Sequence, residues 1–226
     1  MKIYPKISNQ QYSNQVAEKI KQSEGIEIQY FDEIKGKITE PFDFETEIRK
    51  NKSQYPNLKE ITVHPPLKDY DIELIILKDE KILKNQLKKL VKLSKELNIE
   101  LNIIYHTHLP LKQYISTGLD KRMLKYLKII EGSNVTILIE NLFMLPAEEN
   151  ECSALQICKY INHPNLKMCL DTTHVHCKAN IYKKDVYELI KTELNKEDCQ
   201  KYIKQIHFAA ALNNDGYIDK KLRRAE

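Results

Sequence analysis

The stretch Val135-Thr-Ile-Leu-Ile-Glu-Asn141 is an apolar run that ends in a carboxylate and an amide. Successive side chains of a strand point to opposite faces, so Ile137 and Ile139 share one face. Leu138 and Glu140 share the other. We expect the isoleucine face to meet outer helices and Glu140 to point to the centre of a curled sheet. A carboxylate there is costly unless it is paired or metal-bound. The run therefore predicts a metal ligand at a strand end, with a lysine ion pair as the alternative.

Similar strand-like runs recur along the whole chain. They are Lys2–Ser8, Gly25–Phe31, Glu60–His64, Leu101–His106, Val135–Asn141, Leu166–Asp171 and Gln205–Ala209. Helical patterns lie between most of them, at Gln11–Gln22, Lys81–Asn98, Asp120–Ile130, Glu151–Asn162 and Lys184–Ile203. The segment Glu33–Leu58 is less regular, and we expect an extended loop and a short helix near Phe44–Asn51. Alternating strands and helices predict a parallel sheet with helices outside.

The spacing of these units favours an α/β fold of the (β/α) TIM-type barrel, in a single domain over residues 1–226. Seven units in 226 residues leave about 30 residues for each. The alternative, a doubly wound open sheet, is disfavoured because the chain has five glycines and no glycine-rich phosphate loop. No eighth strand is readable after Ala209. We therefore expect an incomplete barrel: open, closed by a partner, or cut short of its natural length.

Six of the seven histidines follow strand-like runs, at His64, His106, His108, His174, His176 and His207. Glu140 and Asp171 occupy the same kind of position. In a barrel, catalytic groups lie at the carboxyl ends of the strands. Imidazole and carboxylate groups are the usual ligands of borderline divalent metals. The pattern predicts a shared metal site that includes at least Glu140, Asp171 and His207.

The element Asp171-Thr-Thr-His174 places a carboxylate at a strand end and an imidazole in the loop that follows. Both could reach one cation, or two neighbouring ones. The alternative is that Asp171 caps the next helix. His106 lies nearer its strand than His108, so His106 is the better ligand and His108 an additional candidate. We expect His176 to be exposed.

The motifs Val-His64-Pro-Pro, His106-Thr-His, Ile-Glu140-Asn, Cys-Leu-Asp171-Thr-Thr-His174 and Ile-His207 resemble, in order and spacing, those of the xylose isomerase-like TIM barrels. The resemblance covers roughly residues 25–219. This superfamily includes endonuclease IV and many sugar-phosphate isomerases and epimerases. The Leu-Asp-x-x-His and Glu-Asn elements are its most specific parts.

In the isomerase branch, the resemblance implies one Mn or Mg ion held by Glu140, Asp171, His207 and a last-strand glutamate. His174 would contact the substrate, and carboxylates would move a proton next to a carbonyl. Glu140 and His174 are therefore the implied catalytic residues. The implied partner is a small sugar or sugar phosphate.

In the endonuclease IV branch, the resemblance implies three zinc ions that activate a hydroxide to attack a phosphodiester. Glu140 would bridge one ion to the next. The further implied ligands are His64 and His106 on the first ion, Asp171 and His207 on the second, and His174 and Asp219 on the third. The chain departs from this pattern because Lys220 and Lys221 follow Asp219 where Asp-x-His is expected, and Leu67 replaces a DNA-probing aromatic. Both branches also expect a glutamate from an eighth strand.

Composition sets bounds on the remaining classes. The chain has a net charge of +4, with 42% hydrophobic and 30% charged residues. No apolar run reaches the ~20 residues of a membrane span, and the start lacks a signal-peptide core. Five cysteines without CxxC spacing favour a reducing cytoplasm. The mild positive charge leaves nucleic acid open as a partner, and a homo-oligomer is compatible with the sequence.

We therefore expect a divalent-metal-dependent isomerase or epimerase of a small sugar or sugar phosphate, with Zn, Mn or Mg. The first alternative is an endonuclease IV-like zinc hydrolase of abasic DNA. The second is a degenerate barrel that binds a ligand without turnover.

Overall fold

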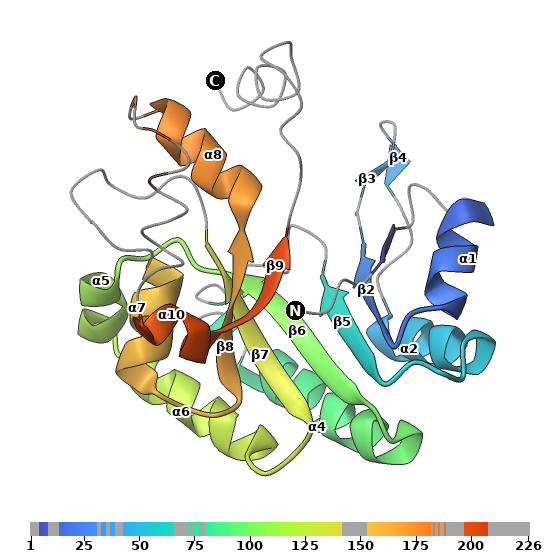
Figure 1. Ribbon diagram of the computed structural model, residues 1–226. Helices are drawn as coiled ribbons and strands as arrows, with labels where there is room; N and C mark the ends of the chain where they lie inside the picture. The colour runs from blue at the N-terminus through green and yellow to red at the C-terminus, as the bar shows by residue number, and fades with distance from the viewer. Residues whose placement is uncertain are drawn as a thin grey trace.

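The computed structural model describes residues 5–8, 14–30, 33–34, 37–38, 43–65, 72, 75–76, 80–141, 153–181, 183, 185, 188 and 197–207. Seven parallel strands form one sheet, in the order β1-β2-β5-β6-β7-β8-β9 (Figure 1). They are β1 (Lys6–Ser8), β2 (Gly25–Gln29), β5 (Glu60–His64), β6 (Glu100–His106), β7 (Val135–Glu140), β8 (Leu166–Asp171) and β9 (Ile203–His207). The sheet curls as an incomplete TIM barrel, which confirms the predicted fold. Among the described residues, no strand joins β9 to β1.

The helices pack mostly on the convex side of the sheet (Figure 1). They are α1 (Asn14–Lys21), α2 (Phe44–Gln54), α4 (Glu80–Leu97), α5 (Leu111–Ser116), α6 (Leu119–Ile130), α7 (Ser153–Ile161), α8 (Thr172–Ile181) and α10 (Glu197–Tyr202). Helix α8 instead stands at the rim where the strands end. None of the described helices is long and apolar enough to span a bilayer.

Helix α4 shows how the sequence forms this outer layer. Leu83, Leu87 and Leu90 recur at helical spacing and are completely buried. Lysines occupy exposed positions of the same helix. Helix α2 begins at Asp43, whose side chain accepts hydrogen bonds from two backbone N–H groups of the first turn. An amphipathic pattern and a cap thus fix where these helices lie and begin.

The strands of the sheet have two different faces. On β7, Ile137 and Ile139 belong to the large core between the sheet and the helices. Leu138 instead packs with Ile104 and Cys169 in a small separate cluster on the inner face. The predicted division of this strand is therefore correct, and Glu140, two residues beyond Leu138, points to the inside.

Several described segments differ from the sequence prediction, and strand pairing explains two of the differences. The helix predicted to run through Ile203 ends at Tyr202, because Ile203 pairs with Met168 and begins β9. In the segment expected to be an extended loop, β3 (Glu33–Ile34) and β4 (Lys37–Ile38) form a small antiparallel pair. Strand β9 therefore begins two residues before the predicted Gln205, whereas β3 and β4 have only two residues each and no strong local signal.

Candidate metal centre

Strand register places the predicted ligands at one rim of the sheet. His106 is the register partner of Glu140 across β6 and β7. Asp171 is the register partner of His207 across β8 and β9. Each of these residues is the last of its strand. Because parallel strands end at the same edge, residues far apart in the chain meet there.

Glu140 lies at the centre of this rim, with only 1% of its surface exposed. Its Oε2 atom lies 3.1 Å from His64 Nε2 and 3.2 Å from His106 Nε2. Its Oε1 atom lies 3.2 Å from His207 Nδ1. Among the described residues, the ion-pair partners of Glu140 are histidines and not the lysine of the alternative prediction.

The charge of Glu140 follows from these contacts. Burial alone would raise the pKa of Glu140, but hydrogen bonds from His106, His207 and His64 lower it well below its ordinary value. Burial likewise opposes the charged form of His207, yet hydrogen bonds to Asp171 and other neighbours raise the pKa of that imidazole. The centre therefore holds an ionised carboxylate surrounded by imidazoles.

Asp171 has two roles, one for each of its oxygens. Its Oδ1 atom accepts hydrogen bonds from the N–H groups of Thr173, at 2.6 Å, and His174, at 3.0 Å. It thus caps α8, as in the alternative prediction. Its Oδ2 atom lies 3.6 Å from His207 Nδ1 and faces the centre. Helix capping and a metal-ligand role are therefore compatible in this residue.

His174 lies in the first turn of α8 and not in the predicted loop. The Asp171 cap explains the difference, because it starts a helix directly after β8. His174 Nδ1 donates a hydrogen bond to the Asn141 carbonyl at 2.6 Å. The same nitrogen lies 3.8 Å from Glu140 Oε1. The ring is therefore held at the edge of the centre.

Asn141 links the ends of β7 and β8. Its Oδ1 atom accepts a hydrogen bond from the Asp171 N–H at 2.7 Å, and its Nδ2 donates to the Asp171 carbonyl at 3.0 Å. The Asn141 side chain thus takes the place of backbone hydrogen bonds between β7 and β8, beyond the last paired residues of these strands. This arrangement fixes the position of Asp171, and it accounts for the Glu-Asn element of the sequence.

Glu27 is a member of the cluster that was not predicted from the sequence. Its Oε2 atom lies 2.7 Å from His207 Nε2, and its Oε1 atom lies 2.8 Å from Lys6 Nζ. Burial alone would raise the pKa of Glu27, but the hydrogen bond and charge of His207, with the charges of Lys6 and His64, lower it to about 2. A single acid within the apolar run Gly25-Ile-Glu-Ile was the available signal.

Among the residues that the structure describes, four groups of side chains have ligand atoms within 4.8 Å of one another. They are Glu27–His64–His207, His64–His106–Glu140, Glu140–Cys169–His207 and Glu140–Asp171–His174. All six predicted metal residues occur in them. Buried carboxylates with imidazoles are the donor set of a borderline divalent metal, so the residues fit such an ion.

The remaining candidates lie apart from these groups. His108 is exposed, and His176 is half-buried rather than exposed as expected. Neither belongs to a candidate group of the described residues. Asp219, like Leu67 and Lys220, lies outside the described residues. Cys169, in contrast, belongs to one of the four groups, and burial raises the pKa of its thiol to about 12.

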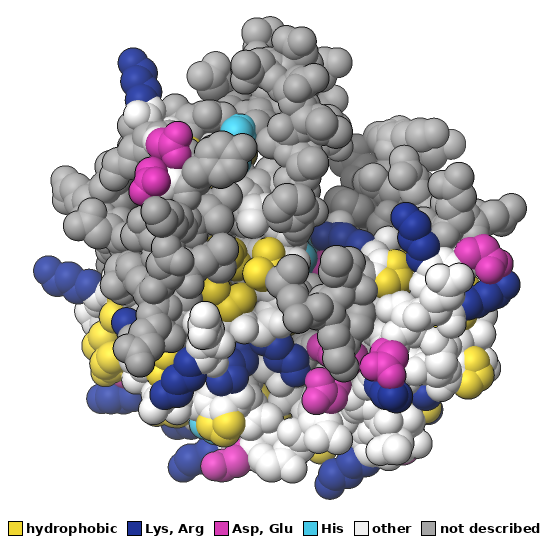
Figure 2. Space-filling model, viewed as in Figure 1, with side chains coloured by type: hydrophobic (Ala, Val, Ile, Leu, Met, Phe, Trp, Pro, Cys, Tyr) yellow, Lys and Arg dark blue, Asp and Glu magenta, His cyan; other side chains and the backbone are white. Residues whose placement is uncertain are grey.

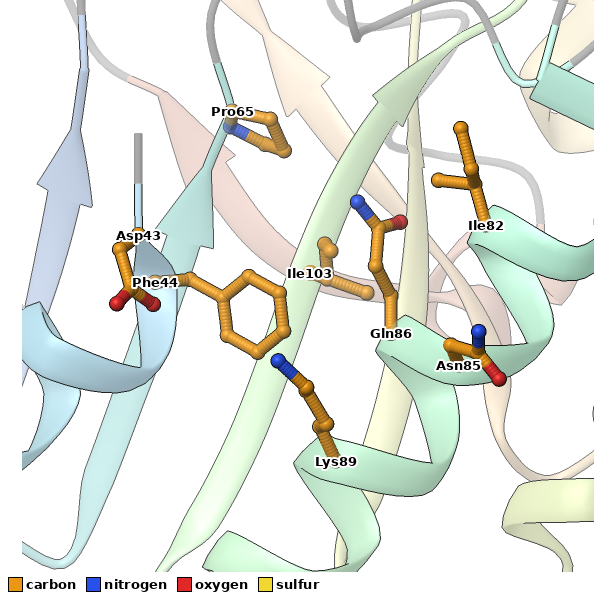
Figure 3. A pocket seen from close by; sticks show the side chains of 8 residues that line it. All are labelled: Asp43, Phe44, Pro65, Ile82, Asn85, Gln86, Lys89 and Ile103. Carbon is orange, nitrogen blue, oxygen red and sulfur yellow. The ribbon is translucent and has the colours of Figure 1, made fainter. Parts of the chain in front are cut away.

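A separate pocket of about 330 Å³ lies on the outer side of the sheet, between α2 and α4 (Figure 3). It is lined by Asp43, Phe44, Pro65, Ile82, Asn85, Gln86, Lys89 and Ile103. Ile103 belongs to the core between the sheet and its helices, so this pocket opens on the opposite face of the sheet from the histidines. The candidate metal centre is therefore distinct from it.

The charge pattern of the surface bears on nucleic-acid binding. On the face shown in Figure 2, the lysine and arginine side chains of the described residues lie at several separate places, with Asp and Glu side chains near them. A continuous basic stripe is the usual footprint of a nucleic-acid site. On the described part of this face, the basic side chains lie among acidic ones.

The fold and the rim together define a member of a known class. The family model "Xylose isomerase-like TIM barrel" matches residues 18–222. The chain belongs to the xylose isomerase-like TIM barrel family. A search of curated protein sequences found no significant match.

Solved structures show the same fold at low sequence identity. A xylose isomerase domain protein from Planctomyces limnophilus is 12% identical, with a TM-score of 0.57 over 91% of this chain and 72% of that one. The 3-keto-D-glucoside 4-epimerase of E. coli is 14% identical, with a TM-score of 0.56 over 99% and 88%. The IolI protein, solved with a bound zinc atom, is 15% identical, with a TM-score of 0.56 over 99% and 84%.

Proposed function

We propose that the protein is a divalent-metal-dependent isomerase or epimerase that acts on a small sugar or sugar phosphate. One observation carries the proposal: Glu140 Oε1 and Asp171 Oδ2 lie 3.2 and 3.6 Å from the same nitrogen, His207 Nδ1. Two carboxylates and an imidazole are suitable ligands for Zn, Mn or Mg. The 3-keto-D-glucoside 4-epimerase and the zinc-bound IolI protein have the same fold, which supports the proposal.

Glu140, Asp171 and His207 would hold the ion. A bound ion would supply Lewis-acid polarisation of a sugar carbonyl. Glu140 is ionised and can accept the proton from the carbon beside that carbonyl. Its contacts with three imidazoles fix the carboxylate, so its oxygens are already oriented before a substrate enters.

His174 is the residue that would meet the substrate. Its side chain is 20% exposed, whereas those of His106 and His207 are 11% exposed and that of His64 is 4% exposed. It is therefore the imidazole of the centre most accessible from the rim. The hydrogen bond from its Nδ1 to the Asn141 carbonyl holds the ring in one orientation.

The second candidate function is an endonuclease IV-like phosphodiester hydrolase. The observation that favours it is the pair His64 and His106, whose Nε2 atoms both lie within 3.2 Å of Glu140 Oε2. This second ligand group suits a site with more than one ion, which would activate water for attack on a phosphodiester.

The test is deuterium exchange into a panel of aldoses, ketoses and their phosphates in D2O, with Mn, Mg or Zn. Abstraction of a proton beside a carbonyl labels the sugar, so mass spectrometry detects the reaction whatever the product is. We expect labelling that requires metal, is lost in Glu140→Gln and persists in His108→Ala, since His108 is exposed and outside the ligand groups.

A parallel assay uses an oligonucleotide with one abasic site. Metal-dependent nicking without sugar labelling would overturn the isomerase proposal in favour of the hydrolase. Metal binding without either reaction would indicate a barrel that binds a ligand without turnover. Labelling that Glu140→Gln retains would contradict the central role of Glu140.

We further propose that the protein is cytoplasmic. A homo-oligomer is compatible with its sequence. The chain has five cysteines, an odd number without CxxC spacing. This pattern suits a reducing compartment, which supports the cytoplasm.

A further inference from the structure

The two ring nitrogens of His207 face different carboxylates. Its Nδ1 lies 3.2 Å from Glu140 Oε1 and 3.6 Å from Asp171 Oδ2. Its Nε2 lies 2.7 Å from Glu27 Oε2. A neutral imidazole that binds a metal through one nitrogen carries its proton on the other. With an ion bound beside Glu140 and Asp171, these contacts would make Nδ1 the metal-facing nitrogen and Nε2 the proton-bearing one.

Glu27 is itself held in place by neighbouring side chains. Gln205 Nε2 donates a hydrogen bond to Glu27 Oε2 at 2.6 Å, and Lys6 Nζ lies 2.8 Å from Oε1. Glu27 is only 4% exposed. A buried carboxylate is costly unless its charge is compensated. Lys6 and His207 compensate it here, and the hydrogen bonds from Gln205 and His207 fix the direction of Oε2.

We propose that Glu27 is a positioning residue that accepts the hydrogen bond of His207 Nε2–H and so directs Nδ1 to the ion held with Glu140 and Asp171. This inference rests on the proposed metal centre. A carboxylate on the far nitrogen of a ligating histidine fixes its tautomer and raises the basicity of the ligating nitrogen. Loss of such a partner weakens metal binding about 10–100-fold.

A different role for Glu27 is that of a direct ligand. Glu27, His64 and His207 form one of the four candidate groups. In that case, His207 Nε2 and not Nδ1 would bind the ion. The two roles thus predict different protonation of the same ring, which makes them distinguishable by spectroscopy.

The first measurement is the zinc affinity of Glu27→Gln, by competition with a chromophoric chelator. The matched control is Glu60→Gln, because Glu60 lies on the adjacent strand opposite Gly25 and accepts a hydrogen bond from Asn102 Nδ2. We expect about 10–100-fold weaker binding for Glu27→Gln and unchanged binding for Glu60→Gln. Circular dichroism and thermal melting would show that each variant is folded.

The second measurement needs no variant at Glu27. In zinc-loaded protein labelled with 15N-histidine, we expect the His207 resonances of a metal-bound Nδ1 and a protonated Nε2, assigned by comparison with His207→Gln. A metal-bound Nε2 would overturn the proposal in favour of direct ligation. Equal zinc affinity of the wild type and a folded Glu27→Gln variant would overturn it and leave the metal centre intact. Absence of zinc binding by the wild type would overturn the metal centre as well.

Discussion

Two parts of the curled sheet, which we call walls, carry their ionisable groups at different positions along the strands. We call β5 to β9 the ligand wall, because these strands end in His64, His106, Glu140, Asp171 and His207. The opposing wall, β1 and β2, ends in Ser8 and Gln29. It contributes Glu27, two residues before the end of its strand. Strand ends thus supply the candidate ligands, whereas the interior of the opposing wall supports one of them.

The curl of the sheet brings the two walls together. Gln205 on β9 accepts a hydrogen bond from Thr62 Oγ1 at 3.0 Å and donates one to Glu27 at 2.6 Å. These partners are 143 and 178 residues away in the chain. His207 is thus held from both sides, by Glu140 of the ligand wall and by Glu27 of the opposing wall.

The largest expected effect is that of Glu140→Gln on metal affinity. The substitution keeps the shape of the side chain but removes the negative charge at the centre of the ligand wall. We expect zinc binding to weaken by more than about 100-fold, beyond the effect of a supporting residue. Chelator competition measures it, and a loss no greater than that of Glu27→Gln would erase the distinction between the walls.

A smaller effect is expected for Asn141→Ala, which removes both hydrogen bonds to the Asp171 backbone. The loss leaves buried groups unpaired, at a cost of about 1–3 kcal/mol in the free energy of unfolding. We also expect about tenfold weaker zinc binding, because Asp171 loses its support. Denaturant unfolding and chelator competition measure the two quantities.

The matched control is Asn165→Ala. Asn165 Nδ2 donates hydrogen bonds to the carbonyls of Ser133 and Val135, at the opposite end of β7. We expect a similar loss of stability with unchanged zinc affinity. If both variants lowered zinc affinity equally, Asn141 would act through general stability and not through Asp171.

The smallest effect is expected for Thr62→Val, which removes the hydroxyl that links β5 to β9, the two ends of the ligand wall, through Gln205. The hydroxyl also accepts a hydrogen bond from Asn102 at 3.1 Å. We expect a loss of about 1–2 kcal/mol in the free energy of unfolding and less than about twofold change in zinc affinity. A change as large as that of Glu27→Gln would mean that this bridge, and not Glu27, positions His207.

The sequence predicts the ligand wall well because its signals are local. The apolar runs before Glu140 and Asp171 define strands by alternation, and their last residues are the candidate ligands. Parallel strands end at one edge, so a chain-order list of strand ends already describes a rim.

Glu27 has a weaker signal, a single acid within an apolar strand. It lies within a strand, and its contact with His207 depends on how far the sheet curls, which no local pattern specifies. The prediction of a loop at His174 fails for a related reason. Asp171 can be read as a ligand or as a helix cap, and only the structure shows that its two oxygens do both.

The most direct test of the account is anomalous diffraction from zinc-soaked crystals at the zinc edge. We expect a peak at about 2.0–2.2 Å from Glu140, Asp171 Oδ2 and His207 Nδ1, with Glu27 within hydrogen-bonding distance of His207 Nε2. No ordered zinc at the rim, or zinc bound only at a site without Glu140, would contradict it.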